Sequence, residues 1–367
     1  MNIQEFQKEF EKIAPPSIAW KGDNIGLLIG RPSDRITNIL VALDLTMDVA
    51  REAKRKKANC IITHHPLLFH PLKNITPTSR TGEVVLFLTE NKMNVYAAHT
   101  NLDSVQWGVN FVLAKKLGLT DLKILSPIKE SLVSIVVFVP STHVEQVADA
   151  MHCAGAGSFT KYDRCSFRAD GTGTFRGNER SSPFIGTRGT LERVQEIRLE
   201  TISELWNVGK VVTAMLKAHP YEEVAYDLIP LLNKNSEYGL GAIGVLPKPV
   251  TQKEFLGNIK QALGLKALKF SGKSSSVRTV AVCGGSGSEF IGDAVAQGAD
   301  AMVTADLKYH TFQEFESKLL LVDAGHYETE HLVLPVLVKK IQQIAKRNGH
   351  SGKVFLTQQS TNPVHIF

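Results

Sequence analysis

The sequence predicts an α/β protein in which two related α/β lobes form the core and a ferredoxin-like α+β domain is inserted between them. Apolar strand-like runs alternate with helices near both ends of the chain, an order typical of parallel βαβ units. The middle of the chain follows the order βαββαβ instead. We therefore expect a core of residues 1–127 and 246–367 and an insert of residues 128–245.

A weak internal duplication supports the two lobes. "ILVALDLTMDVAREAKRKKANCIITHH" and "VAVCGGSGSEFIGDAVAQGADAMVTAD" each comprise an apolar strand, a turn, a helix and an apolar strand ending in polar residues. We expect residues 36–65 and 277–306 to form related βαβ units, with the strand ends of both lobes converging on one cleft.

Apolar periodicity locates the helices and strands along the whole chain. The predicted strand at 195–203 in the insert, for example, alternates apolar with charged residues, as half-buried strands do. We expect helices at 3–13, 46–58, 82–92, 107–118, 143–155, 205–220, 288–299 and 337–349, strands at 37–45, 59–65, 93–103, 131–140, 165–177, 195–203, 222–231, 277–285, 300–306 and 318–326, and loops at 20–30 and 233–244.

The composition excludes several classes of protein. Of 367 residues, 43% are hydrophobic and 21% are charged, as in globular chains, and no run of ~18 apolar residues predicts a membrane span. The N-terminus lacks the apolar segment of a signal peptide. The four cysteines form no C-x-x-C pair, which argues against a disulfide framework or a zinc ribbon. We expect a cytoplasmic protein with no membrane partner.

The net charge of +6 is mildly basic, and "REAKRKKAN" at 51–59 carries much of the local excess. A solvated helix face explains this segment most simply, and a phosphate or nucleic-acid patch is the alternative. No nucleic-acid recognition motif accompanies the segment, and aromatic residues make up only 7% of the chain.

Ligand-type side chains follow the apolar runs at three places. His64 and His65 end one predicted strand, Asp103 ends another, and "GHYETE" contains His326 and Glu330. If the strand stops at His64, both imidazoles can turn toward one pocket, and Pro66 cannot extend a central strand. Imidazole and carboxylate ligands without thiolates suit divalent transition metals.

The pair His326 and Glu330 has the i, i+4 spacing that places side chains on one helix face. Pro335 removes a helical hydrogen bond to His331, so the helix is either kinked there or starts later. Either arrangement brings the pair together, and Glu330 could bridge two metals.

Three other motifs leave alternatives open. "CGGSGS" at 283–288 is a tight turn or a phosphate cradle. Asp306 and His310 in "TADLKYH" either support the metal site or contact substrate, or they are ordinary caps. In the insert, "GTGTFRGN" (171–178) and "HPYEEVAYDL" (219–228) could bind a small molecule or make trimer-type sheet contacts.

Six motifs occur in an order that resembles one known family, the GTP cyclohydrolase I type 2 homologues, also called NGG-interacting-factor-three-like proteins. The resemblance covers residues 1–127 and 246–367, and the longer members carry a PII- and CutA-like domain matching 128–245. The motifs are "WKGDNIGLLIG", "THHPLLF", "AAHTNLD", "CGGSGS", "TADLKYH" and "GHYETE".

The resemblance implies two divalent metal ions per subunit, with His65 and Asp103 on one, His64 and His326 on the other, and Glu330 bridging. Zinc, iron, manganese or cobalt would fit these ligands. It also implies a homohexameric toroid. His70 has no role in the pattern. Ala305 stands where many members have glycine, and we expect little change at the metals from this difference.

The family's name implies a metal-dependent hydrolase that acts on a nucleotide such as GTP or on a related small molecule. His99 is then a candidate proton shuttle, and Asn101, Asp306 and His310 are candidate supporting or substrate contacts. The alternative is a regulatory or scaffold toroid in which the metals are structural and the insert senses a ligand.

Overall fold

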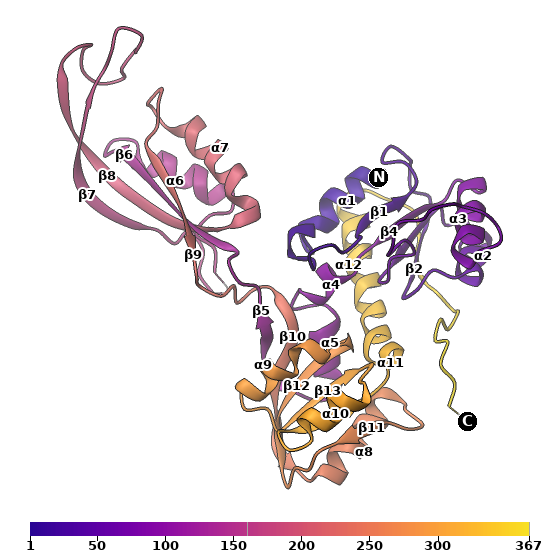
Figure 1. Cartoon of the computed structure of the whole chain (residues 1–367). Helices are drawn as coiled ribbons and strands as arrows, with labels where there is room; N and C mark the ends of the chain where they lie inside the picture. The colour runs from indigo at the N-terminus through magenta and orange to yellow at the C-terminus, as the bar shows by residue number, and fades with distance from the viewer. Residues whose placement is uncertain (160, 367) are drawn as a thin grey trace. The chain divides into compact units, whose positions relative to one another are not determined.

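The computed structural model describes residues 1–159 and 161–366 and has a mixed α/β architecture (Figure 1). The chain divides into two compact units. One unit, here called the core unit, contains residues 1–126 and 238–367, and the other, the inserted unit, contains 127–237. None of the described helices combines the length and the hydropathy that a bilayer-spanning segment needs.

The first lobe of the core unit is built on a five-stranded sheet with the order β1-β4-β3-β2-β15. Strands β15, β2, β3 and β4 are parallel, and β1 pairs antiparallel with β4. The lobe contains β1 (Gly26–Ile29), β2 (Ile39–Ala42), β3 (Cys60–Thr63), β4 (Asn94–Ala97), β15 (Val354–Leu356), α1 (Ile3–Glu11), the 3₁₀ turn Pro16–Ile18, α2 (Met47–Arg55), α3 (Arg80–Glu90), α4 (Thr100–Asp103) and α12 (Leu334–Arg347).

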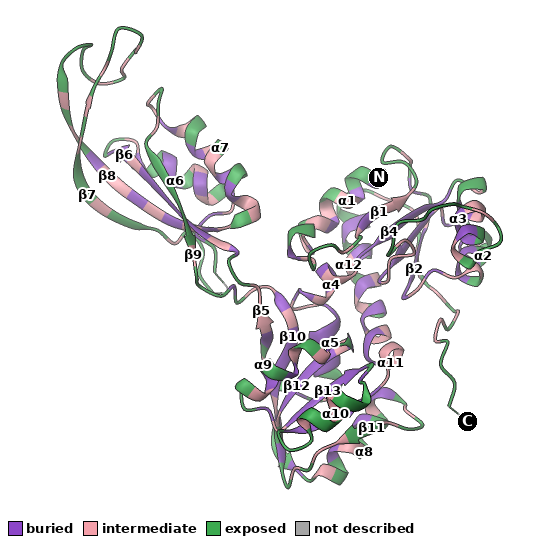
Figure 2. Cartoon of the chain, in the orientation of Figure 1, coloured by how far each residue is buried: buried purple, intermediate pink, exposed green. Residues whose placement is uncertain are grey.

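Helices cover both faces of this sheet, so its central strands are buried along their whole length (Figure 2). Leu40 and Ile61 pack toward α2 and α3. Tyr96 points to the opposite face, where its ring meets Phe6 and Phe10 of α1 edge-on. Successive strand residues alternate between the two faces, which explains this division.

The second lobe carries a six-stranded sheet with the order β11-β14-β13-β12-β10-β5. Strands β12, β13 and β14 are parallel, and their residues alternate between a cluster with α5 and α8 and a cluster with α9. The lobe contains β5 (Thr120–Pro127), β10 (Gly239–Val250), β11 (Lys269–Ser271), β12 (Val277–Ser286), β13 (Ala301–Ala305), β14 (Leu320–Asp323), α5 (Val109–Lys116), α8 (Gln252–Leu263), α9 (Ile291–Ala296), the 3₁₀ turn Ser288–Phe290, α10 (Tyr309–Phe315), α11 (His326–Glu330) and the 3₁₀ turn His331–Val333.

The inserted unit has a four-stranded antiparallel sheet with the order β7-β8-β6-β9. Alternate residues of β6, such as Ile135 and Val137, pack against Met151 of α6 and Met215 of α7 on one face. The unit contains β6 (Leu132–Pro140), α6 (Val144–Cys153), β7 (Phe167–Arg176), β8 (Leu191–Glu204), the 3₁₀ turn Leu205–Asn207, α7 (Val208–Ala218) and β9 (Tyr226–Leu231).

Two sequence predictions are corrected by the strand pairing. Residues 20–30 are not all loop, because Gly26–Ile29 forms edge strand β1. Residues 239–245 belong to the core unit instead of the insert, because β10 pairs with β12 from Ala242 onward. The glycines of this strand hid its periodicity from the sequence argument.

The question raised by Pro335 has a definite answer. Helix α11 ends at Glu330, a 3₁₀ turn follows, and α12 starts at Leu334 with Pro335 in its first turn. Proline costs little there, because the first N–H groups of a helix have no partner within it. The His–Glu pair therefore lies on its own short helix.

Both duplicated segments form parallel βαβ units. In the first, β2 and β3 flank α2, and in the second, β12 and β13 flank α9. Asp306, which follows β13, thus occupies the place that His64 takes after β3. Asp306 has a φ of 57°, a left-handed conformation that short polar residues tolerate.

Candidate metal centre

The paired histidines begin where strand β3 stops. Thr63 is its last residue, and the N–H groups of His64 and His65 still donate to Ala42 O and Leu43 O. Both imidazoles turn toward the same side, with ring centroids 4.9 Å apart. The end of a parallel strand therefore brings two neighbouring imidazoles to one place.

Two other segments complete the cluster. His64 Nε2 lies 3.6 Å from Asp103 Oδ1 and 3.8 Å from Glu330 Oε1. On the other side of Glu330, Oε2 lies 3.0 Å from His65 Nε2 and 3.1 Å from His326 Nε2. The two oxygens of one carboxylate thus face two different groups of side chains.

These contacts differ from the pairing that the resemblance implies. His64 lies beside Asp103, and His65 lies beside His326 with their Nε2 atoms 3.3 Å apart. Asp103 also lies in the helical turn α4, not at the end of a strand, because β4 stops at Ala97. The five side chains still converge, with the two histidines of the pair exchanged.

Each imidazole is oriented through its Nδ1 atom. His64 Nδ1 donates to Ala98 O at 2.9 Å, which directs Nε2 at the cluster. The Nδ1 atoms of His65 and His326 lie 2.7 Å from carboxylate oxygens of Asp44 and Asp306, respectively. A hydrogen bond at Nδ1 selects the tautomer that can bind a metal through Nε2.

Several buried polar atoms of the cluster have no hydrogen-bond partner among the described residues. They are His64 Nε2, Asp103 Oδ1 and Glu330 Oε2. An orphaned buried polar atom is costly. His64 Nε2 and Asp103 Oδ1 lie 3.6 Å apart, and Glu330 Oε2 faces two other imidazoles. Orphaned atoms in this arrangement fit bound cations, and the donor set of imidazole and carboxylate suits a transition metal.

The electrostatics agree with an anionic, cation-attracting site. Burial opposes the charged form of His65, but Asp44 and Glu330 raise its pKa to about 10. Glu330 raises the pKa of His326 to about 9 against the effect of burial. Burial would raise the pKa of Glu330, yet the surrounding histidines hold that pKa well below its usual range. A divalent cation would replace the protons that these histidines attract.

The glycine-rich segment after β12 forms a wall of this site. Gly285 has a φ of +61°, and a Cβ there would meet Glu330 Oε1 at 2.1 Å and His326 Nε2 at 3.1 Å. Its N–H donates to Thr329 Oγ1 at 3.0 Å, and its carbonyl accepts from Thr304. At "CGGSGS" the backbone thus comes close to the cluster, and its hydrogen bond to Thr329 fixes the position of α11.

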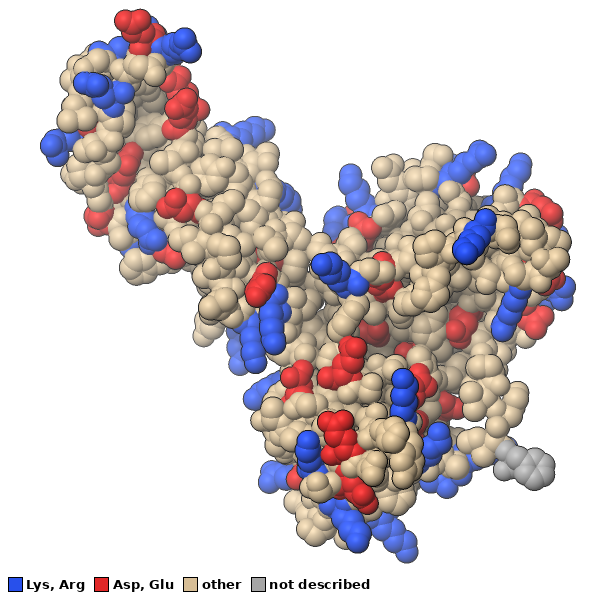
Figure 3. Space-filling model, viewed as in Figure 1, with Lys and Arg blue, Asp and Glu red and all other residues tan. Residues whose placement is uncertain are grey.

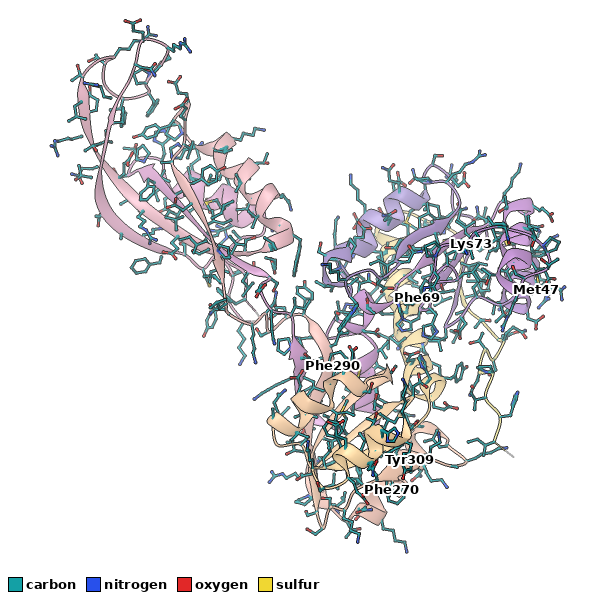
Figure 4. All side chains as sticks on the ribbon, viewed as in Figure 1. Met47, Phe69, Lys73, Phe270, Phe290 and Tyr309 are labelled. Atoms are coloured by element: carbon teal, nitrogen blue, oxygen red, sulfur yellow. The ribbon has the colours of Figure 1, made fainter. Side chains whose placement is uncertain are left out.

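A pocket of about 720 Å³ opens beside the cluster and includes His65, His99 and His326 in its lining. Phe69, labelled in Figure 4, lines it with its ring centroid 6.1 Å from that of His99. Lys269 adds a positive charge. The volume suits a small organic molecule.

The remaining predicted residues have different surroundings. His99 contacts both paired histidines, and nitrogens of all three rings lie within 4.8 Å of one another. Asp306 supports His326, despite Ala305 before it. Asn101 is buried and donates to Ala14 O. His310 is exposed and contacts Gln313 and the ring of Tyr309, so the structure does not bring it to the cluster.

Two supporting residues were missed by the sequence argument. Asp44 follows β2 and holds His65, and Thr361 donates to its second oxygen at 2.5 Å. Asp23 holds His99 Nδ1 at 2.8 Å and accepts from Thr100. The sequence did offer a signal for Asp44, which is a carboxylate at the end of a predicted strand. In the second duplicated segment, the glycine-rich turn occupies the corresponding place.

The fold and the cluster define a mixed α/β protein with a buried histidine–carboxylate site that could bind metal ions. The profile of the Duf34/NIF3 family (NGG1p interacting factor 3) matches residues 1–363. The chain therefore belongs to the Duf34/NIF3 family.

The relatives cover nearly the whole chain. A GTP cyclohydrolase 1 type 2 homolog of Halalkalibacterium halodurans is 40% identical over 99% of this chain and 98% of its own length. The homolog of Bacillus subtilis is 38% identical over the same shares. The crystal structure of a Bacillus cereus protein related to NIF3 matches with a TM-score of 0.89 at 40% identity, covering 100% of this chain and 99% of that one.

Proposed function

We propose that the core unit binds two divalent metal ions and hydrolyses a nucleotide or a related small molecule. The observation that carries the proposal is Glu330, whose two oxygens face separate groups of ligand atoms. One metal would lie between His64 and Asp103 and the other between His65 and His326. Relatives of high identity carry the name GTP cyclohydrolase 1 type 2 homolog, which supports the substrate class.

When bound, such a metal pair supplies a hydroxide near neutral pH and polarises the bond under attack. His99 would move the proton. Its Nδ1 is held by Asp23, so Nε2 remains available beside the cluster. Lys269 would attract an anionic group of the substrate, and Phe69 would pack against an apolar ring.

The experiment is metal-dependent turnover by the full chain. GTP and other nucleotides are incubated with protein loaded with zinc, iron, manganese or cobalt, and products are followed chromatographically. Glu330→Ala should lose both metal and turnover. Turnover that survives metal loss in this variant would contradict the proposal.

His99→Ala separates a proton shuttle from a further ligand. A shuttle role predicts that metal content, measured by mass spectrometry, is unchanged while turnover falls about 100-fold or more. Loss of metal from this variant would instead make His99 a ligand.

We also infer that the inserted unit is a ferredoxin-like domain and that subunits assemble into a homohexameric toroid. The strand order β7-β8-β6-β9 and the two helices on one face support the first inference. Light scattering of the full chain tests the second, and a monomer at micromolar concentration would contradict it.

Regulation is the second candidate function, with structural metals and a ligand-sensing insert. A ring-lined pocket in the inserted unit favours it. Binding of nucleic acid receives little support, because basic and acidic side chains are interspersed over the surface shown in Figure 3.

A further inference from the structure

The inserted unit contains a pocket of about 200 Å³ that the proposed metal chemistry does not use. It lies where the end of β7 and the loop after it meet the loop after α7. The segments 171–178 and 219–228, which the sequence singled out, both contribute to it.

Aromatic rings form one wall of this pocket. The Tyr221 ring centroid lies 5.9 Å from that of Phe175 and 6.4 Å from that of Phe184. His143 meets Phe184 edge-on from outside, at 5.4 Å. Ring faces gathered in this way can receive a cation as well as an apolar group.

Hydrogen bonds fix Tyr221 in place. His219 is buried, accepts from the Tyr221 N–H at Nδ1, and donates from Nε2 to Phe138 O at 3.0 Å. Burial lowers the pKa of His219, which agrees with this neutral tautomer. The Tyr221 hydroxyl donates to Glu196 Oε1 at 2.9 Å. The wall is therefore formed before any ligand arrives.

The loop that follows β7 is hydrogen-bonded to the loop that carries Tyr221, and the lining contains side chains of both charges. The Ser182 N–H donates to Glu222 Oε1 at 2.7 Å. Arg176 and Glu223 also line the pocket, and neither forms an ion pair with any described residue. The pocket is thus bordered by the guanidinium of Arg176 and by two carboxylates, of which Glu222 holds the Ser182 N–H and Glu223 has no hydrogen-bond partner among the described residues.

We propose that this pocket binds a small zwitterion, a free amino acid. Arg176 receives the carboxylate, because its planar guanidinium matches a carboxylate in two parallel hydrogen bonds. Glu223 and the aromatic faces receive the ammonium group. A ligand of single charge would leave one of the two side chains unmatched. A nucleotide exceeds the volume, since pockets for drug-sized ligands start near ~300 Å³.

The test is isothermal titration of the metal-loaded full chain with each of the twenty protein amino acids. At least one should bind, and Arg176→Gln and Glu223→Gln should each weaken it roughly tenfold or more. Arg180→Gln and Glu179→Gln, from the same loop but outside the lining, are the matched controls. The amine that lacks the carboxylate should bind wild type and Arg176→Gln equally.

Three results would overturn the proposal. They are no binding by any of the twenty amino acids, equal affinity in wild type and in the two pocket variants, and loss of binding in Glu330→Gln. The last result would place the amino acid on the metals of the core unit. Retained binding in Glu330→Gln supports the pocket whether or not the hydrolase proposal holds.

Discussion

His65 Nε2 and His326 Nε2 lie 3.3 Å apart although 261 residues separate them in the sequence. One follows a strand of the first lobe and the other begins a helix after a strand of the second. Two imidazole nitrogens at this distance either share a proton in a hydrogen bond or face a common cation, because two bare lone pairs would repel each other. The contact therefore links the folding of both lobes to the candidate metal site.

Asp44 should control the affinity for metal without binding it. Replacing it by asparagine in Asp44→Asn removes the carboxylate that holds His65 Nδ1, and such outer partners are worth about 10–100-fold in metal affinity. Competition with a chelating dye measures the change. Asp48→Asn, at an exposed position on α2, is the control and should change nothing. Equal affinities in both variants would show that Asp44 does not orient a ligand.

Gly285→Ala should displace Glu330. The new methyl group would lie 2.1 Å from Glu330 Oε1, so we expect metal affinity to fall by about 10–100-fold. Gly298→Ala is a matched control, because Gly298 also has a positive φ, +71°, but open space around its Cβ position. Both variants share a strain of roughly 1 kcal/mol, so unfolding by urea should separate this cost from the loss of metal. The same metal affinity in both would contradict the account of the glycine wall.

Glu52 should make stability depend on pH outside the metal site. Burial would raise its pKa, but Lys56, Thr357 and the Gln358 N–H hold it below the usual 4.5. A carboxyl whose pKa is lowered by folding stabilises the folded chain above pH 4.5, and the contribution is lost as pH falls through the lower value.

Glu52→Gln tests this contribution. At pH 7 the variant should lose roughly 1–3 kcal/mol in the free energy of urea unfolding, and the difference from wild type should shrink as the pH falls below 4.5. Glu83→Gln on α3 is an exposed control. A difference that stays constant down to pH 3, within the range where both variants fold, would contradict the assignment.

Much of the candidate site could be predicted from the sequence, because the carboxyl ends of parallel strands lie at the same edge of a sheet and bring their side chains together. The strand before His64 and His65 is a continuous apolar run, and i, i+4 spacing joins His326 to Glu330. Which side chains each histidine contacts could not be predicted, because these contacts depend on the rotation of each ring. Asp23 lies 76 residues from His99 and carries no local signal.

In the fold, too, some elements could be predicted from the local sequence and others could not. Strands β2, β3, β12 and β13 are apolar runs that periodicity identifies directly. Strand β10 contains three glycines in its first half and two prolines near its end, and it forms because β12 offers a partner. Pairing between segments distant in the chain decides such strands, and a local pattern cannot show it.

If Glu330 joins two metal ions, a crystal structure of the metal-loaded protein with anomalous data at several metal edges will show both of them. We expect two anomalous peaks, one between His64 and Asp103 and one between His65 and His326, each within coordination distance of a different Glu330 oxygen. A single peak, or peaks away from these five side chains, would contradict it.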